Sequence, residues 1–215
     1  MSDENLEQGL TSRYVIKKAL GNYPPWQGFA VTDSLSDRDY LFFSLLPPSG
    51  VSFSLDDLKM RDYLFSRQGG IVYATLSLQK NNGGITFLLP SVELIPLTKA
   101  LPSMQPRKSL EVMRVLVSQV VKRLGSGLFF HNLTPESLVI VNGSLKILPT
   151  AYLLPGEILQ RLTETGSEQG ETVEPIFRDL NKLGTILTIF SRFIAPETSG
   201  TCQGLSRRLL ALGPP

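Results

Sequence analysis

The polar side chains most suited to chemistry lie in one stretch, "GLFFHNLTPESLVIVNG" at 127–143, which is followed by "SLKILPTAYLLP". The pattern predicts two short strands around a loop, and loops on a rigid scaffold often carry catalytic groups. This loop contains His131, Asn132, Glu136 and Ser137. Proton transfer and magnesium binding depend largely on carboxylates. The stretch therefore has the form of an active site, but most of the acids that such a site needs are missing.

Composition indicates an ordinary folded domain and excludes several classes of function. The 215 residues, 42% of them hydrophobic, suffice for one domain with a buried core. The net charge of +2 comes from 21 basic and 19 acidic residues that are well mixed along the chain, which argues against a nucleic-acid-binding face. The single cysteine, Cys202, cannot form an internal disulfide and indicates a reducing compartment. With one histidine and one cysteine, we expect no structural zinc site.

The sequence predicts neither a targeting signal nor a membrane segment. It starts with "MSDENLEQ", which is polar and acidic, unlike a secretory signal. The apolar run "LFFSLL" at 41–46 is far shorter than the roughly 20 residues that cross a bilayer. We therefore expect a cytoplasmic protein without membrane contact in this segment. The chain ends "LLALGPP", which is typical of the edge of a linker, so we expect an N-terminal part of a longer protein.

The elements that would position the loop begin with a sheet-rich half. Alternating apolar residues, interrupted by Gly, Pro and Asn turns, predict strands over 13–21, 28–33, 38–46, 70–79 and 84–90. "NYPPWQ" joins the first two strands as a turn. Ser54 begins a predicted helix, with Asp57 at its third position in a capping arrangement.

The second half is predicted to be helical. One helix covers 109–125, with Ser109 as its cap, Gly125 as its stop and an apolar stripe of Leu110, Met113, Val117, Val120, Val121 and Leu124. Two further helices are predicted over 179–194 and 204–212, and the polar stretch 162–175 is predicted to be a loop. The order indicates an α+β, two-lobed fold: a polar tail at 1–12, a β-rich lobe at 13–90 and a shortened helical lobe at 91–215.

Four stretches of this sequence resemble protein kinases, and bacterial serine/threonine kinases most of all. "FHNLTPESLVI" is similar to the kinase catalytic loop H-R-D-L-K-P-E-N-I-L-V, and "LKILPTA" to the K-I-x-D-F-G segment. "RDLNKLGTIL" resembles the start of the central helix of the large lobe, and "VTDSLSDRDYLFF" the hairpin of strands two and three. The resemblance implies the protein-kinase fold over nearly all residues from Arg13 onward.

The same resemblance places other residues where kinases keep their catalytic groups. Asn132 stands in place of the Asp base, and an amide cannot take up a proton near neutral pH. Ser137 replaces the Asn that holds a second magnesium ion. Pro149 replaces the metal-binding Asp and has neither a carboxylate nor a backbone N–H. Phe43, or Ser44 after a one-residue shift, replaces the lysine that pairs with the phosphates. Catalysis by the usual kinase route is not expected.

The nucleotide cleft is also altered. Of the glycine-rich loop only Gly21 and Gly28 remain, and Trp26 with two prolines lies between them. An adenine slot lined by Val31 and Leu138 would be a vestige, so we expect no cofactor and weak or absent ATP binding. Trp26 fits two interpretations equally, an exposed recognition point or a plug of the cleft.

Six residues match the structural part of the kinase motifs: Phe130, His131, Pro135, Glu136, Asp179 and Gly184. The resemblance implies that Asp179 binds the backbone of the catalytic loop, an architectural role. The simpler interpretations are that Phe130 packs in the core and that His131 is a loop residue with one hydrogen bond. Asn132 and Ser137 would then cap local turns.

The sequence therefore predicts a pseudokinase that acts as a protein-binding scaffold or an allosteric module, with an unidentified protein partner and no nucleic acid. Three alternatives stay open. The fold could bind nucleotide as a switch without phosphoryl transfer. A relocated active site could use Glu136, Asp179 and Asp39, the nearby acids. The resemblance could also be accidental, which a structure without a cleft between two lobes would establish.

Overall fold

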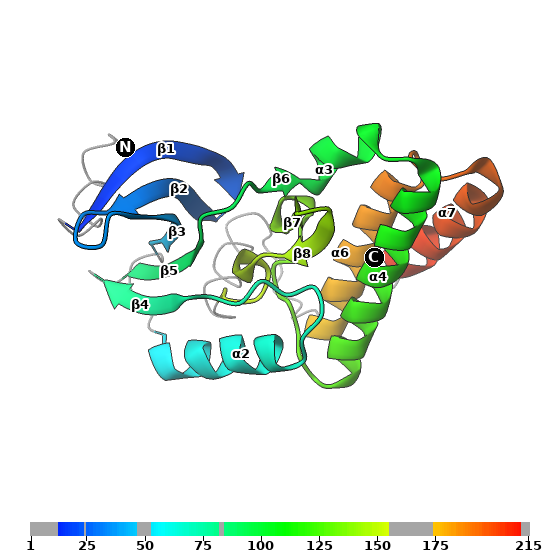
Figure 1. Ribbon diagram of the computed structural model, residues 1–215. Helices are drawn as coiled ribbons and strands as arrows, with labels where there is room; N and C mark the ends of the chain where they lie inside the picture. Colours follow the sequence, from blue (N-terminus) through cyan, green and yellow to red (C-terminus); the bar gives the residue numbers. More distant parts are fainter. Residues whose placement is uncertain (1–12, 24, 47–52, 82–83, 155–173, 212–215) are drawn as a thin grey trace.

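The computed structural model describes residues 13–23, 25–46, 53–81, 84–154 and 174–211. Its N-terminal half is a five-stranded antiparallel sheet in the order β1-β2-β3-β5-β4. The strands are β1 (Tyr14–Tyr23), β2 (Trp26–Asp33), β3 (Arg38–Leu45), β4 (Ser77–Asn81) and β5 (Gly84–Pro90). Helix α2 (Leu55–Arg67) lies along one side of this sheet (Figure 1).

The β1–β2 connection is shorter than the sequence predicts. The strands continue past the predicted ends until Tyr23 pairs with Trp26, so most of "NYPPWQ" is strand rather than turn. The two glycines of the predicted loop, Gly21 and Gly28, lie directly opposite each other in the ladder. Cross-strand pairing of aromatic residues stabilises such an extension. A paired hairpin therefore occupies most of the predicted six-residue turn.

The predicted strand at 70–79 is wrong in its first part. Only Ser77 and the residues after it join the sheet. The preceding segment instead crosses to the second half of the molecule, where Val72 forms a parallel bridge with Ile147. The glycines that open the segment, Gly69 and Gly70, both have positive φ, which bends the chain away from the sheet.

The start of α2 is confirmed as predicted. The side chain of Ser54 accepts a hydrogen bond of 3.2 Å from the backbone N–H of Asp57. This bond satisfies one of the amide groups that have no partner inside the first turn. Leu58 and Phe65 are the buried residues of the helix and set the face that packs on the core.

The C-terminal half combines a small sheet with helices. The antiparallel sheet has the order β6 (Ile95–Pro96), β7 (Leu138–Val141) and β8 (Ser144–Ile147). The α-helices are α3 (Leu97–Ala100), α4 (Pro106–Gly125), α6 (Pro175–Phe190) and α7 (Pro196–Leu210), and short 3-10 helices span Leu101–Ser103, Pro135–Ser137 and Pro149–Ala151. Figure 1 shows β-rich and helical lobes side by side, which confirms the α+β, two-lobed plan. The predicted loop at 162–175 lies almost wholly outside the described residues.

Helix α4 begins earlier than predicted, and its predicted apolar stripe packs on the core except at Val121. Pro106 occupies its first turn, where a missing N–H costs nothing. Ser109 is therefore buried inside the helix and is not its cap. Val121, part of the predicted stripe, is 53% exposed. The helix does end at Gly125, as predicted.

Helices α6 and α7 pack closely because of Gly184. A Cβ atom there would come within 3.1 Å of the backbone oxygen of Ser206 and of side-chain atoms of α7. The Ser206 hydroxyl uses this proximity and donates a 2.8 Å hydrogen bond to the carbonyl of Gly184. The predicted structural role of Gly184 is therefore the tight contact between the last two helices.

The two lobes are joined by hydrogen bonds as well as by apolar contact. The Tyr73 N–H donates to the Ile147 carbonyl at 2.9 Å. Arg123, fully buried at the end of α4, donates to the Gly69 carbonyl at 2.8 Å and to the Gln119 side chain at 2.7 Å. One hydrophobic cluster runs through both lobes. None of the described helices has both the length and the apolar character needed to cross a membrane.

Candidate functional site

One face of the N-terminal sheet carries a group of four buried aromatic rings that we call the aromatic cluster, and these rings belong to the hydrophobic cluster that continues into the second lobe. Its members are Tyr23, Trp26, Phe43 and Phe87, none of them more than 5% exposed. Phe43 stacks on Phe87 with centroids 4.9 Å apart and planes at 10°. Tyr23 meets Phe43 edge-on at 5.3 Å, and Trp26 meets Phe87 edge-on at 5.0 Å. These geometries are the favourable ones for aromatic pairs.

Trp26 is 1% exposed, so the interpretation of it as an exposed recognition point is wrong. The ring belongs to the core of the sheet. Its indole N–H has no hydrogen-bond partner within the described part of the chain, which is a cost that the surrounding ring contacts offset.

Gly28 is the residue that makes room for the aromatic cluster. A Cβ atom at this position would come within 2.9 Å of the Phe43 ring and 3.3 Å of the Tyr23 ring. Kinases use glycine in this region so that the backbone can approach phosphate. Here the space above the glycine is filled by two side chains of the protein itself.

The prediction that Val31 lines an adenine slot together with Leu138 is wrong for Val31. Val31 packs with Phe42 and Leu88 on the opposite face of the sheet, in a separate hydrophobic cluster. Its neighbour Ala30 packs against the main core, which contains Leu138. Successive residues of a strand point to opposite faces, so an assignment one residue out of place selects the wrong face.

The loop between α4 and β7 uses Asn132 to bind the segment after β8. The Asn132 side-chain amide donates a 3.1 Å hydrogen bond to the carbonyl of Thr150. Its backbone N–H donates to the carbonyl of Ala151 at 3.0 Å. A carboxylate could not donate the first of these bonds. Asn132 therefore stabilises the contact between two loops, whereas the simpler interpretation predicts only a cap of its local turn.

Ser137 closes the turn that begins at Thr134. Its hydroxyl donates to the Thr134 carbonyl at 2.7 Å and accepts from the Thr134 N–H at 3.1 Å. In return, the Thr134 hydroxyl accepts from the Ser137 N–H at 3.3 Å, which completes a capping box. Ser137 is 2% exposed. The predicted capping role is confirmed, and the proton and one lone pair of this hydroxyl serve the turn.

Pro149 opens a buried 3-10 turn, Pro149–Ala151, directly after β8. The carbonyl of Pro149 accepts hydrogen bonds from the N–H groups of Tyr152 and Leu153 at 3.0 and 2.8 Å. Proline suits the first position of such a turn because its φ is already fixed and no N–H is left unpaired. Pro149 thus organises the local backbone.

Asp179 binds the backbone of the loop, as the resemblance implies. The carboxylate of this fully buried residue of α6 accepts hydrogen bonds from the N–H of Phe130 at 2.6 Å and of His131 at 3.0 Å. Burial raises the pKa of Asp179 to about 6, and the two N–H groups act in the opposite direction. Arg61 of α2 lies near this charge and donates to the Phe129 carbonyl at 2.9 Å.

His131 has a positive φ of 64°, a conformation that the two hydrogen bonds to Asp179 hold in place. Burial, together with the nearby charges of Arg61 and Arg178, lowers the pKa of His131 to about 3. The ring is therefore neutral at physiological pH. Phe130 is fully buried and meets Phe65 of α2 edge-on at 5.1 Å, which confirms its predicted role in the core.

One central contact was missed by the sequence reasoning. Tyr152 is fully buried, and its ring stacks on Phe65 at 4.3 Å with the planes at 5°. Its hydroxyl donates to the Asp62 carboxylate at 2.9 Å, and Thr75 donates to the other oxygen of that carboxylate at 2.5 Å. Asp62 therefore has a partner in each lobe. The signal in the sequence was one aromatic residue after "LPTA", which carries no indication of a partner ninety residues away.

The three acids considered for a relocated active site have separate surroundings. Asp39 of β3 accepts bonds from Lys17 and Thr32 on the exposed outer side of the sheet, both at 2.7 Å. Glu136 is exposed in the turn after Thr134, and Asp179 is buried against the loop backbone. Within the described residues, no group of three or more His, Cys, Asp or Glu side chains could hold a metal ion.

Solved structures with the same arrangement are protein kinases. The crystal structure of the kinase domain of Mycobacterium tuberculosis PknI superposes with a TM-score of 0.59 at 14% identity, covering 95% of this chain and 91% of that one. A single-substitution variant of that domain gives a TM-score of 0.60 at 14% identity, with 95% and 90% covered. The chain has a protein-kinase-like fold. No family model and no curated protein matches the sequence.

Two elements that contact each other have positions known from the protein-kinase-like fold. α2 occupies the position of the N-lobe helix, and the turn Pro149–Ala151 that of the metal-binding segment. In kinases an ion pair between a strand-three lysine and a helix glutamate fixes that helix. In this chain, α2 is instead held to the second lobe by Tyr152 through Asp62 and Phe65.

Proposed function

We propose that this chain is a kinase-like domain without phosphoryl-transfer activity that acts by binding another protein, as a scaffold or allosteric module. The observation that carries the proposal is the aromatic cluster. Phe43 stands where the resemblance places the lysine that pairs with the ATP phosphates, and it is fully buried between Tyr23 and Phe87. A cationic side chain is therefore replaced by an apolar stack in the part of the fold where triphosphate binds in kinases.

The residues at the other catalytic positions support the same proposal. Asn132 binds the segment after β8, while Ser137 and Pro149 make contacts within their own turns. An oxygen ligand for Mg²⁺ is most often a carboxylate, and none of these three residues has one. The transition state of phosphoryl transfer is stabilised by a base, a metal and a lysine acting together. All three are replaced at the positions that the resemblance assigns to them.

A binding role is supported by the contacts that hold the lobes together. Kinase activation depends on movement of the N-lobe helix and of the metal-binding segment. In this chain the corresponding elements are joined by the Tyr152–Phe65 stack and the Tyr152–Asp62 hydrogen bond. A molecule with a fixed relation between its lobes presents a constant surface, which suits a scaffold.

Thermal unfolding of the purified chain with millimolar ATP, with magnesium or with EDTA, tests the proposal. A ligand that binds only the folded state stabilises it by about 2.7 kcal/mol at a hundred times its Kd. For a chain of this size, each kcal/mol raises Tm by about 2–4 °C. We expect no change of Tm in either condition. A rise that persists in EDTA would support a nucleotide switch instead, and a rise that requires magnesium, together with label transfer from ATP, would overturn the proposal.

A further inference from the structure

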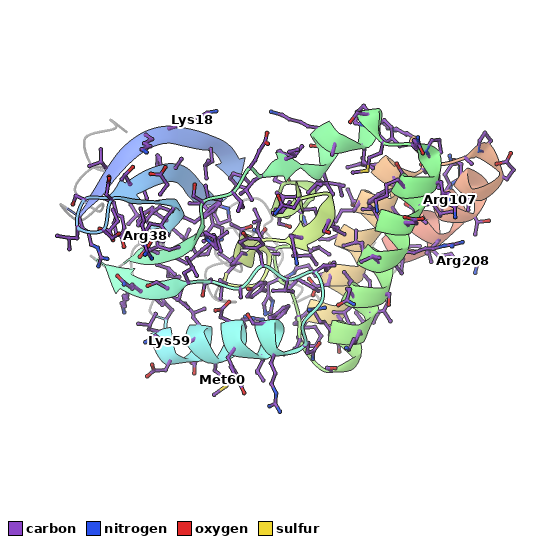
Figure 2. All side chains as sticks on the ribbon, viewed as in Figure 1. Lys18, Arg38, Lys59, Met60, Arg107 and Arg208 are labelled. Atoms are coloured by element: carbon purple, nitrogen blue, oxygen red, sulfur yellow. The ribbon has the colours of Figure 1, made fainter. Side chains whose placement is uncertain are left out.

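The outward face of α2 is apolar at its centre and charged at its ends. Asp56, Met60, Tyr63 and Arg67 follow one another at steps of four, three and four residues, so they form one line along the helix. Met60 is 57% exposed and Tyr63 is 55% exposed. In Figure 2 the Met60 side chain points away from the rest of the molecule. This line, which we call the α2 stripe, lies opposite the buried residues of the helix.

The α2 stripe is larger than a scattered exposed side chain. Leu64, 38% exposed, adjoins it on one side, and the aliphatic stem of Lys59 adjoins it on the other. Single exposed apolar residues are common on protein surfaces, but apolar side chains that adjoin one another along a helix mark interaction sites. The charges of the stripe have no ion pair within the described residues; the Arg67 guanidinium lies 6.0 Å above the Tyr63 ring.

Two copies of the α2 stripe that run antiparallel would place complementary residues opposite each other. A twofold axis through the midpoint of the helix, between Arg61 and Asp62, exchanges Asp56 with Arg67 and Met60 with Tyr63. Two antiparallel copies would thus bring opposite charges together at both ends. In the centre, each Met60 thioether would meet a Tyr63 ring, a favourable sulfur–aromatic contact. An isologous interface requires this self-complementarity.

We propose that α2 is an interaction surface for a second copy of this chain, which packs antiparallel against it through the α2 stripe. A helix of 13 residues is about 20 Å long, and helix axes in contact lie about 8–10 Å apart. The buried area is then below the roughly 1,200–2,000 Å² of stable interfaces. The dimer is therefore weak, with a dissociation constant in the micromolar range or above. The proposal is independent of whether the cleft binds nucleotide.

Sedimentation velocity of the full chain over a micromolar concentration range tests the dimer. The wild-type sedimentation coefficient rises with concentration toward that of a dimer. Asp56→Arg and Arg67→Asp each place like charges together at both ends, so each weakens association at least tenfold. The double variant restores opposite charges across the interface and recovers most of the affinity. Such a recovery is expected only if residues 56 and 67 face each other in antiparallel helices.

Two further variants keep the result interpretable. Met60→Lys changes a side chain outside the core, so the monomer stays folded, and it abolishes association. Val121→Lys, at a position of α4 that is 53% exposed, leaves association unchanged and is the matched control. Thermal unfolding of each variant checks that it is folded.

Three results would overturn the proposal. The first is a chain that stays monomeric at all concentrations, whether or not it binds a different protein. The second is a dimer that both charge reversals leave unaffected. The third is a loss of association in the two single variants with no recovery in the double variant while all are folded.

Discussion

Phe43→Lys introduces the residue type that the resemblance places at this position in kinases, and we expect it to destabilise the protein strongly rather than to create a phosphate site. The side chain is fully buried, with Phe87 stacked on it at 4.9 Å and Tyr23 at its edge. A lysine loses both ring contacts and brings an ammonium group into an apolar core. Neither Tyr23 nor Phe87 has an anionic group to pair with it.

The magnitude follows from three contributions. Truncation of a buried Phe costs about 3–5 kcal/mol, of which the aliphatic stem of lysine recovers a part. The lost ring contacts account for about 0.5–1.5 kcal/mol each. The ammonium group must then be neutralised or reach solvent, which adds further cost. We expect a total of about 4–6 kcal/mol, a large share of the roughly 5–15 kcal/mol by which domains are stable.

Urea denaturation followed by circular dichroism measures this loss. Phe43→Leu is the matched control, since it keeps an apolar side chain and loses mainly the ring contacts; we expect about 1–2 kcal/mol. The reasoning would be refuted by a Phe43→Lys variant that is as stable as Phe43→Leu. A variant of that kind which also gained magnesium-dependent ATP binding would mean that the cleft is open and merely lacks its lysine.

Three other substitutions test single contacts. Asn132→Asp places a carboxylate against the Thr150 carbonyl and should cost about 1–3 kcal/mol in urea denaturation without any gain in label transfer from ATP; equal or higher stability would contradict this role of the amide. Tyr152→Phe keeps the stacked ring but removes the bond to Asp62, so we expect a loss of about 1–3 kcal/mol, and no loss would mean that the hydroxyl does not hold α2. His131→Asn suits the positive φ, and it should remove a pH dependence. Burial lowers the pKa of His131 to about 3 in the folded state, so between about pH 6.5 and pH 3 only the unfolded chain takes up the proton. The free energy of unfolding of the wild type therefore falls by up to about 1.4 kcal/mol for each pH unit in this range. Parallel pH profiles of unfolding for the two proteins would count against this account.

Features set by neighbouring residues could be predicted from the sequence. The cap of Ser54 on Asp57 depends on two residues three positions apart, and the structure has it as predicted. The stop of α4 at Gly125 is of the same kind. The binding of the loop backbone by Asp179 was implied by family resemblance and is confirmed by two hydrogen bonds.

Features set by distant partners could not be predicted in the same way. Val31 was assigned to the cleft, but strand faces alternate, and one residue of difference moves the side chain to the other side of the sheet. Whether Trp26 is exposed or buried depends on how far the β1–β2 pairing extends, and that extent is a property of two strands and not of one. The contact of Tyr152 with Asp62 joins residues ninety positions apart.

The intrinsic fluorescence of Trp26 gives the most direct test of the central claim, because it is the single tryptophan of the chain and belongs to the aromatic cluster. Its emission is measured during a titration with ATP and magnesium up to millimolar concentration, with excitation at wavelengths that adenine does not absorb. The account predicts the blue-shifted emission of a buried indole, protected from acrylamide and unchanged by nucleotide. A saturable change of emission with ATP that EDTA abolishes would contradict it, since nucleotide and metal would then be entering the space that the aromatic cluster fills.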